Sequence, residues 1–194
     1  MSSSEFRSRA REQLGGGIFT EQWLMALAAS LIVNVLSTIA GSIVPYIGGL
    51  LVLGPLCYGL SYVFLNQARD GQPINLGDLF KGFNADFLQY FLLGLMISIF
   101  TYLWSMLFVI PGIIKAYSYS MAYYIKVDNP TWGWKDCIDE SRKKMDGHKM
   151  ELFLLDLSFI GWFLLGSLAC GLGVLWVVPY MNVSHAHFYE AIRN

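Results

Sequence analysis

The residues that could do chemistry in this sequence are a few ionisable and aromatic side chains inside long apolar segments. Asp156 and His185 stand in two successive apolar stretches, and Lys115 opens a run that also holds Tyr117 and Tyr119. Ionisable groups at membrane depth are costly and face protein or water, so they mark ligand sites or transport paths. We therefore expect these five residues to form a ligand site or a transport path.

Each of these side chains also has a structural explanation, and the sequence leaves both open. Asp156 falls near the start of its helix, where the helix dipole favours a carboxylate. His185 is either a buried, hydrogen-bonded histidine or a partner of Asp156. His187, two residues further on, points to nearly the opposite helix face, so the two histidines are poorly placed to share a metal ion.

Lys115 has two alternatives of its own. It either extends along the helix toward the outer surface, or it is the cation of a cavity with an aromatic wall. The tyrosines that would line such a cavity are Tyr117, Tyr119, Tyr123 and Tyr124.

Motifs for known reactions are absent from the sequence. It contains no GxGxxG, GxxxxGK[ST], GxSxG or HExxH pattern, and its three cysteines form no CxxC pair. A single carboxylate at membrane depth supplies no acid and base pair. We therefore expect no enzyme activity, no metal and no cofactor. The formal net charge of −1 gives no basic surface for nucleic acid.

The elements that carry these residues are long uncharged segments. Hydrophobic residues make up 55% of the 194 residues and charged residues 14%. Asp, Glu, Lys and Arg are absent from 47 consecutive residues after Glu21, from 28 after Asp86 and from 33 after Asp156. A helix needs about 20 apolar residues to cross a bilayer. The sequence predicts an all-α, polytopic membrane bundle of six transmembrane helices in three hairpins, over residues 22–44, 48–68, 86–110, 112–128, 150–170 and 173–191.

Lysine and arginine predict the orientation. Twelve of the 13 lie in the N-terminal arm, in residues 69–81 and 126–149, or at Arg193, and Lys115 is the exception. Cytoplasmic loops collect these residues. Both termini should then lie in the cytoplasm of a multi-pass protein of the bacterial cytoplasmic membrane. Uncharged turns at residues 44–49, 111–112 and 171–173 should face outward.

Amphipathic stretches precede the hairpins. In residues 131–146, Trp134, Ile138 and Met145 share one helical stripe with Cys137 and Ser141, and Trp132 lies just before it. This pattern predicts a helix in the lipid headgroup plane with tryptophan anchors. Shorter stripes occur in the N-terminal arm and before the third span.

Residues 59–73 and 116–130 align at a constant offset of 57, with Ser61, Tyr62 and Pro73 repeated. This alignment predicts an internal repeat of interfacial helix plus hairpin. The chain is then a single integral membrane domain, 1–194. Its parts are a cytoplasmic arm (1–21), a first hairpin (22–68), an interfacial segment with a second hairpin (74–128) and an interfacial helix with a third (131–191).

Three segments carry a family resemblance, residues 110–122, 147–153 and 157–166. With them in view, nearly the whole chain resembles the bacterial integral membrane proteins catalogued as domain of unknown function nine hundred and seventy-five. The resemblance implies a membrane location in a bacterium of Gram-positive type, but no activity and no functional residues. A fainter similarity, to membrane domains fused to some glycerophosphodiester phosphodiesterases, hints at a lipid or protein partner.

These observations favour a non-enzymatic membrane protein that binds a lipid or a membrane-protein partner through its cytoplasmic amphipathic helices. The alternative is a small transporter or channel with Asp156, Lys115 and the tyrosines along its path. The possible partners are therefore the bilayer itself, another membrane protein or further copies of the chain.

Overall fold

The computed structural model describes residues 3–16, 20–43, 48–84, 86–168 and 172–193. It is all-α, as the sequence predicts, and no strand occurs within these ranges. The elements along the chain are α1 (Ser3–Gln13), α2 (Glu21–Ile43), α3 (Gly48–Asp70), the 3-10 helix η1 (Leu76–Phe83), α4 (Phe87–Leu107), α5 (Val109–Tyr119), α6 (Ala122–Asp128), α7 (Trp134–Lys144), α8 (Lys149–Leu168) and α9 (Leu172–Ile192).

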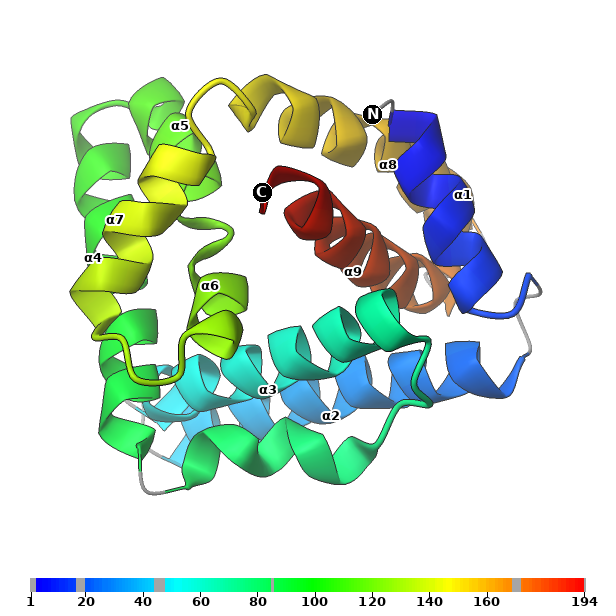
Figure 1. Cartoon of the computed structure of the whole chain (residues 1–194), viewed down its shortest axis with the longest axis horizontal. Coiled ribbons are helices and arrows are strands. Elements are labelled where there is room, and N and C mark those ends of the chain that lie inside the picture. Colours follow the sequence, from blue (N-terminus) through cyan, green and yellow to red (C-terminus); the bar gives the residue numbers. More distant parts are fainter. Residues whose placement is uncertain (1–2, 17–19, 44–47, 85, 169–171, 194) are drawn as a thin grey trace.

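Three pairs of consecutive helices pack as hairpins: α2 with α3, α4 with α5, and α8 with α9 (Figure 1). Helices α3 and α9 also pack against each other and hold the pairs together, with α9 crossing the centre of the view. The sequence predicts turns at 44–49 and 171–173. Residues 44–47 and 169–171 lie outside the described residues, and the described remainder of each predicted turn begins α3 or α9.

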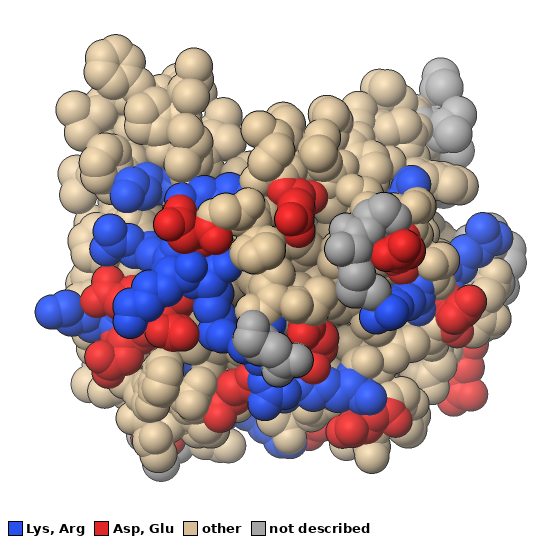
Figure 2. All heavy atoms as spheres, turned by 45° about the horizontal axis from the view of Figure 1, so that its top comes forward, with Lys and Arg blue, Asp and Glu red and all other residues tan. Residues whose placement is uncertain are grey.

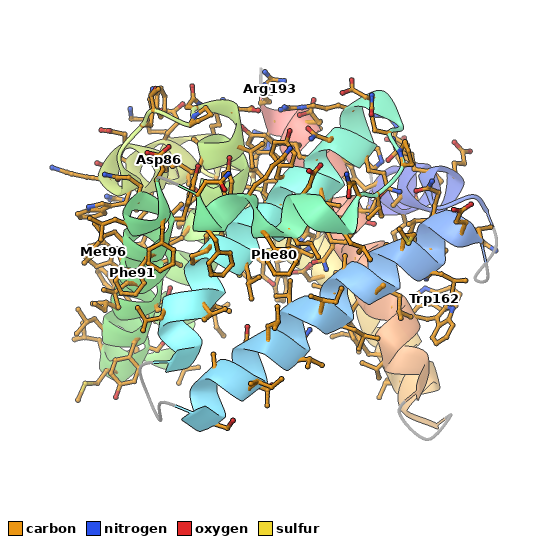
Figure 3. All side chains as sticks on the ribbon, turned by 90° about the horizontal axis from the view of Figure 1, so that it is seen from below. Phe80, Asp86, Phe91, Met96, Trp162 and Arg193 are labelled. Atoms are coloured by element: carbon orange, nitrogen blue, oxygen red, sulfur yellow. The ribbon has the colours of Figure 1, made fainter. Side chains whose placement is uncertain are left out.

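Charged side chains gather on one face of the molecule, where both signs are mixed (Figure 2). In Figure 3, Arg193 lies at the upper edge of the molecule and Asp86 lies below it, at the start of α4, and the helices of the three hairpins diverge downward. We call the charged face the collar and define it by residues 3–13, 69–86, 126–151 and 190–193. An unpaired charge is costly in an apolar medium, so this segregation keeps one side of the molecule apolar.

Three helices among the described residues are long and apolar enough to cross a membrane: Glu21–Ser42, Leu51–Asp70 and Phe87–Leu107. The structure therefore supports three of the six expected spans. Helices α8 and α9 adjoin residues 169–171, which the structure does not describe.

The fourth expected span, 112–128, is wrong as a single helix. Helix α4 ends at Leu107, and Phe108 is extended, with φ −158° and ψ 142°. The break therefore precedes Pro111, which lies in the first turn of α5, where proline's missing N–H is tolerated. Helix α5 is 11 residues long, and a turn at Ser120 and Met121 separates it from α6.

The amphipathic stripe of α7 faces protein. Cys137, Ser141 and Met145 are fully buried and Ile138 is 3% exposed, because α7 packs against α4, α5 and α6. The expectation that this stripe contacts lipid headgroups is therefore wrong. Apolar stripes look alike in sequence whether lipid or protein covers them.

The other two stripes differ from each other. In the N-terminal arm, the buried face of α1 packs on α9, where the rings of Phe6 and Phe188 lie 5.4 Å apart. In η1, Leu79 is fully buried, whereas Phe80 and Phe83 are 46% and 40% exposed. Gly59 allows η1 to lie directly on α3, since a Cβ at this glycine would be 2.0 Å from the Leu79 carbonyl oxygen.

The two segments of the proposed repeat end differently. Helix α3 continues through Arg69 to Asp70, whereas its counterpart breaks between α5 and α6. Arg69 forms ion pairs, and Lys126, at the equivalent position, donates to backbone carbonyls. The repeat stays a sequence prediction.

The packing of α7 predicts an unreactive thiol at Cys137. Burial raises the pKa of this thiol to about 11, so at pH 7.5 almost none of it is the reactive thiolate. In a variant without Cys57 and Cys170, we expect maleimide to label folded Cys137 on the order of a hundredfold more slowly than it labels a cysteine introduced by Lys143→Cys. Lys143 is the control because its side chain is 75% exposed on the same helix. Equal rates would mean that α7 does not pack on the bundle.

Candidate functional site

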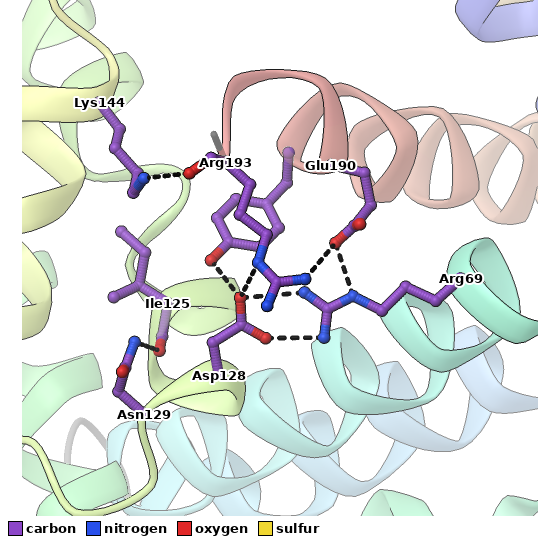
Figure 4. A network of polar contacts seen from close by, with 8 residues as sticks. Arg69, Ile125, Asp128, Asn129, Lys144, Glu190 and Arg193 are labelled. Carbon is purple, nitrogen blue, oxygen red and sulfur yellow. Dashed lines mark hydrogen bonds and ion pairs between the residues drawn. The ribbon is translucent and has the colours of Figure 1, made fainter.

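The strongest polar contacts form a cluster where α3, α6 and α9 meet (Figure 4). Arg69 Nη1 lies 2.7 Å from Asp128 Oδ1, and Arg69 Nε donates to Glu190 Oε1 at 2.6 Å. Arg193 Nε lies 3.1 Å from the other Asp128 oxygen, to which the Tyr189 hydroxyl donates at 2.8 Å. Asp128 is only 10% exposed, so these contacts are screened less than ordinary surface ion pairs.

Two lysines tie the neighbouring segments to this cluster. Lys144 donates to the backbone carbonyl of Arg193 at 2.6 Å and so joins α7 to the end of α9 (Figure 4). Lys126 is 1% exposed and donates to the carbonyls of Pro130 and Trp132. It therefore holds the loop that leads into α7.

Three of the expected site residues meet between α5, α8 and α9. Asp156 Oδ1 lies 2.6 Å from His185 Nε2, and the Tyr117 hydroxyl donates to Asp156 Oδ2 at 2.9 Å. Both carboxylate oxygens are thus engaged, and the two side chains of the His185–Asp156 pair are about one fifth exposed. The structure gives Asp156 partners from two other helices, which satisfies the charge of a carboxylate among apolar residues.

His187 does not join this group. It is buried, and its Nε2 has no hydrogen-bond partner among the described residues. This separation agrees with the opposite helix faces expected for positions two apart.

Lys115 lies apart from this group, beside an aromatic groove that includes Tyr119 but not Tyr117, Tyr123 or Tyr124. Its Nζ is 4.7 Å from the centre of the Trp104 ring, and the side chain lines a groove of about 500 Å³ between α5, α7 and the start of α8. The residues of this groove, which we call the basic groove, are Lys115, Ser118, Asp139, Arg142, Lys143, Asp146 and Lys149. Lys115 therefore faces the collar, because α5 is short and α7 packs across it.

The tyrosines do not share one cavity. Tyr119 is 5% exposed and lines a smaller groove beside Lys115 and Trp134. Tyr124 stacks on Tyr189 with ring centres 5.4 Å apart, and Tyr117 points to Asp156. The residues expected along one path are divided between separate places.

Another groove, of about 280 Å³, adjoins the basic groove at Lys149. We call it the apolar groove, because its other residues are Ile110, Ile113, Ile114, Tyr117, Met150 and Phe153. Helices α5 and α8 form its walls, and the Tyr117 and Phe153 rings meet edge to face with centres 6.0 Å apart.

A further groove, of about 490 Å³, lies between the end of α3 and η1 and is lined by polar side chains. Amide side chains, Asp70 and Asp78 line it, together with Gln67, whose amide has no hydrogen-bond partner among the described residues. Its carboxylates repel an anion, whereas the cations of the basic groove attract one.

The residues predicted for the interfacial helix make contacts within the protein. Met145 is fully buried and Ile138 nearly so, while Trp134 is partly buried against the core. Trp132 is 38% exposed, and its carbonyl accepts from Lys126. The groove cations that the sequence did not assign to a site are Arg142 and Lys143 on α7 and Lys149 at the start of α8. Their spacing gave no signal, because the chain turns between Met145 and Lys149.

The chemistry available in these places is binding rather than metal coordination. Within the described residues, no group of three or more His, Cys, Asp or Glu is placed to hold a metal ion. The basic groove offers ammonium and guanidinium donors, which suit phosphate or carboxylate oxygens.

Comparison with known proteins gives one match. Residues 106–194 match the family described as "Protein of unknown function (DUF975)". The resemblance expected along nearly the whole chain is thus confirmed for its C-terminal part. No curated protein and no solved structure matches the chain.

The ion-pair cluster predicts that Asp128→Asn destabilises the fold. The substitution removes the carboxylate that two arginines and a tyrosine share, which should cost about 2 kcal/mol and lower the melting temperature by about 5 °C. The measurement is a thermal scan of the detergent-solubilised protein. Asp70→Asn is the control, because Asp70 is exposed and adjoins Arg69. Equal melting temperatures for the two variants would show that the cluster contributes no stability.

Proposed function

We propose that this chain, whose residues 106–194 match a family of unknown function, is a non-enzymatic protein of the bacterial cytoplasmic membrane. In this proposal the three hairpins lie in the bilayer, and both termini lie with the collar in the cytoplasm. The collar binds a lipid or a membrane-protein partner at its basic groove.

Exposed apolar residues support the membrane location. Around the turn between α4 and α5, Met106 is 76% and Phe108 is 72% exposed, and Ile110 is 71% exposed. Contiguous apolar surface of this kind is unfavourable in water and is typical of membrane or protein contact. The collar carries nearly all the lysine and arginine, which favours its placement in the cytoplasm.

The observation that carries the binding function is the basic groove between α5, α7 and α8. One side of α7 is fixed by its buried stripe, so the backbone of the helix holds Arg142 and Lys143 beside the groove. A rigid helix that presents cations beside an opening is suited to binding an anionic group.

The test is native mass spectrometry of the whole protein, released in mild detergent from membranes washed with sodium carbonate. We expect the protein to stay in the washed membranes and to retain a defined lipid or protein. Charge reversal at the groove, Arg142→Glu with Lys143→Glu, should reduce the retained fraction at least several-fold, because the groove then repels anions.

The matched control is Arg9→Glu with Arg11→Glu, which reverses two exposed charges on α1. It should leave retention unchanged. Protein that is recovered bare from its own membrane, or that is lost in the carbonate wash, would contradict the proposal.

A small transporter is the second candidate, and the contact of Tyr117, Asp156 and His185 favours it. Hydroxyl, carboxylate and imidazole groups in hydrogen-bond contact can pass protons between helices. Lys115 and Tyr119 line other grooves. The proposed transport path therefore includes only the contacting residues Tyr117, Asp156 and His185.

For transport, we expect ion or proton flux into liposomes that contain the protein, with Asp156→Asn returning it to the protein-free level. Asp146→Asn is the control, since this carboxylate is 85% exposed. Flux that equals the protein-free level for the unaltered protein would eliminate this candidate.

A further inference from the structure

We propose that the basic and apolar grooves together form one binding site for a phospholipid with an anionic headgroup. The phosphate of the lipid lies in the basic groove, and an acyl chain lies in the apolar groove. This inference rests on the proposed function and names the ligand of the collar.

The two grooves adjoin each other at Lys149. Lys149 lines both of them, and α5 walls both, with Lys115 and Ser118 in the basic groove and Ile113, Ile114 and Tyr117 in the apolar one. A ligand that fills both must therefore carry a charged group and an apolar chain next to each other, as a phospholipid does.

The charge of the basic groove favours an anionic headgroup over a zwitterionic one. Four cations and two carboxylates line it. The distances are 3.3 Å from Arg142 to Asp139, 3.5 Å from Lys143 to Glu140 and 3.7 Å from Lys149 to Asp146. These pairs are longer than the ion pairs that Asp128 forms. Within the described part of the chain, Lys115 forms no ion pair and faces the Trp104 ring.

This arrangement differs from the arginines of the ion-pair cluster. Arg69 and Arg193 are each satisfied by carboxylates of the protein itself. The cations of the basic groove keep capacity for an external anion, and arginine can bind phosphate through two parallel hydrogen bonds. Basic pockets at the cytoplasmic ends of membrane helices suit lipid headgroups in this way.

The apolar groove offers a surface for an acyl chain, which a free headgroup does not have. Ile113 and Ile114 are about half exposed, and Met150 is 64% exposed. Phe153 closes the groove against Tyr117. An acyl chain would cover these exposed side chains, and burial of this surface should add affinity.

The experiment titrates the whole protein in mild detergent with phosphatidylglycerol and with phosphatidylcholine, read by native mass spectrometry. We expect a single bound phosphatidylglycerol with an affinity at least tenfold above that of phosphatidylcholine. Lys115→Gln with Lys149→Gln should lower the phosphatidylglycerol affinity about tenfold or more. Arg9→Gln with Arg11→Gln removes the same charge from α1 and should change nothing.

Two further variants test the basic groove and the apolar groove separately. Arg142→Gln, at a side chain that is 51% exposed, should weaken phosphatidylglycerol binding without disturbing the fold. Ile114→Gln should weaken binding of the lipid and leave binding of glycerol phosphate, the headgroup fragment, unchanged. Glycerol phosphate or inorganic phosphate should displace the lipid only at far higher concentration.

Equal affinity for the two lipids would overturn the inference, as would equal losses in the groove variant and the α1 control. Displacement of the lipid by phosphate at matched concentration would also overturn it, since the site would then bind a free anion. If phosphatidylglycerol binds unchanged in the groove variants, this site is wrong while lipid binding by the collar stands. The proposed function itself fails if the native protein retains neither lipid nor protein, or if it is lost from carbonate-washed membranes.

Discussion

Asp128 is the residue on which the arrangement of the hairpins depends. It lies at the end of α6 and is bound by Arg69 of α3, by Arg193 beyond α9 and by Tyr189 of α9. A carboxylate with so little exposure is stable only when its oxygens are satisfied. These contacts therefore fix α3, α6 and α9 relative to one another at the collar.

The rest of the collar is built outward from this point. Lys144 ties α7 to the chain end, and the buried Lys126 holds the loop before α7. Because α7 is positioned in this way, its buried stripe packs on α4, α5 and α6 and its charged side faces the basic groove. The groove is thus a consequence of how the cluster anchors the C-terminal segments.

The break between α5 and α6 explains why the sequence misplaced Lys115. A continuous helix over 112–128 would put this lysine far from the collar. Phe108 is extended and the chain turns again at Ser120, so α5 is short and crosses α7. Pro111 suggested a break, but proline fits the first turn of a helix, and the break lies three residues earlier.

The sequence by itself determined the all-α class, the long uncharged helices and the separation of charge, because composition and spacing follow directly from burial and helix period. It also brought Asp156 and His185 into consideration as partners, since two ionisable groups in apolar helices need each other. The tertiary structure alone decided that the α7 stripe faces protein and that Lys115 joins Arg142 and Lys149. The physical reason is that protein and lipid offer similar apolar surroundings, so only the contacts between distant segments distinguish a buried face from a lipid-facing one.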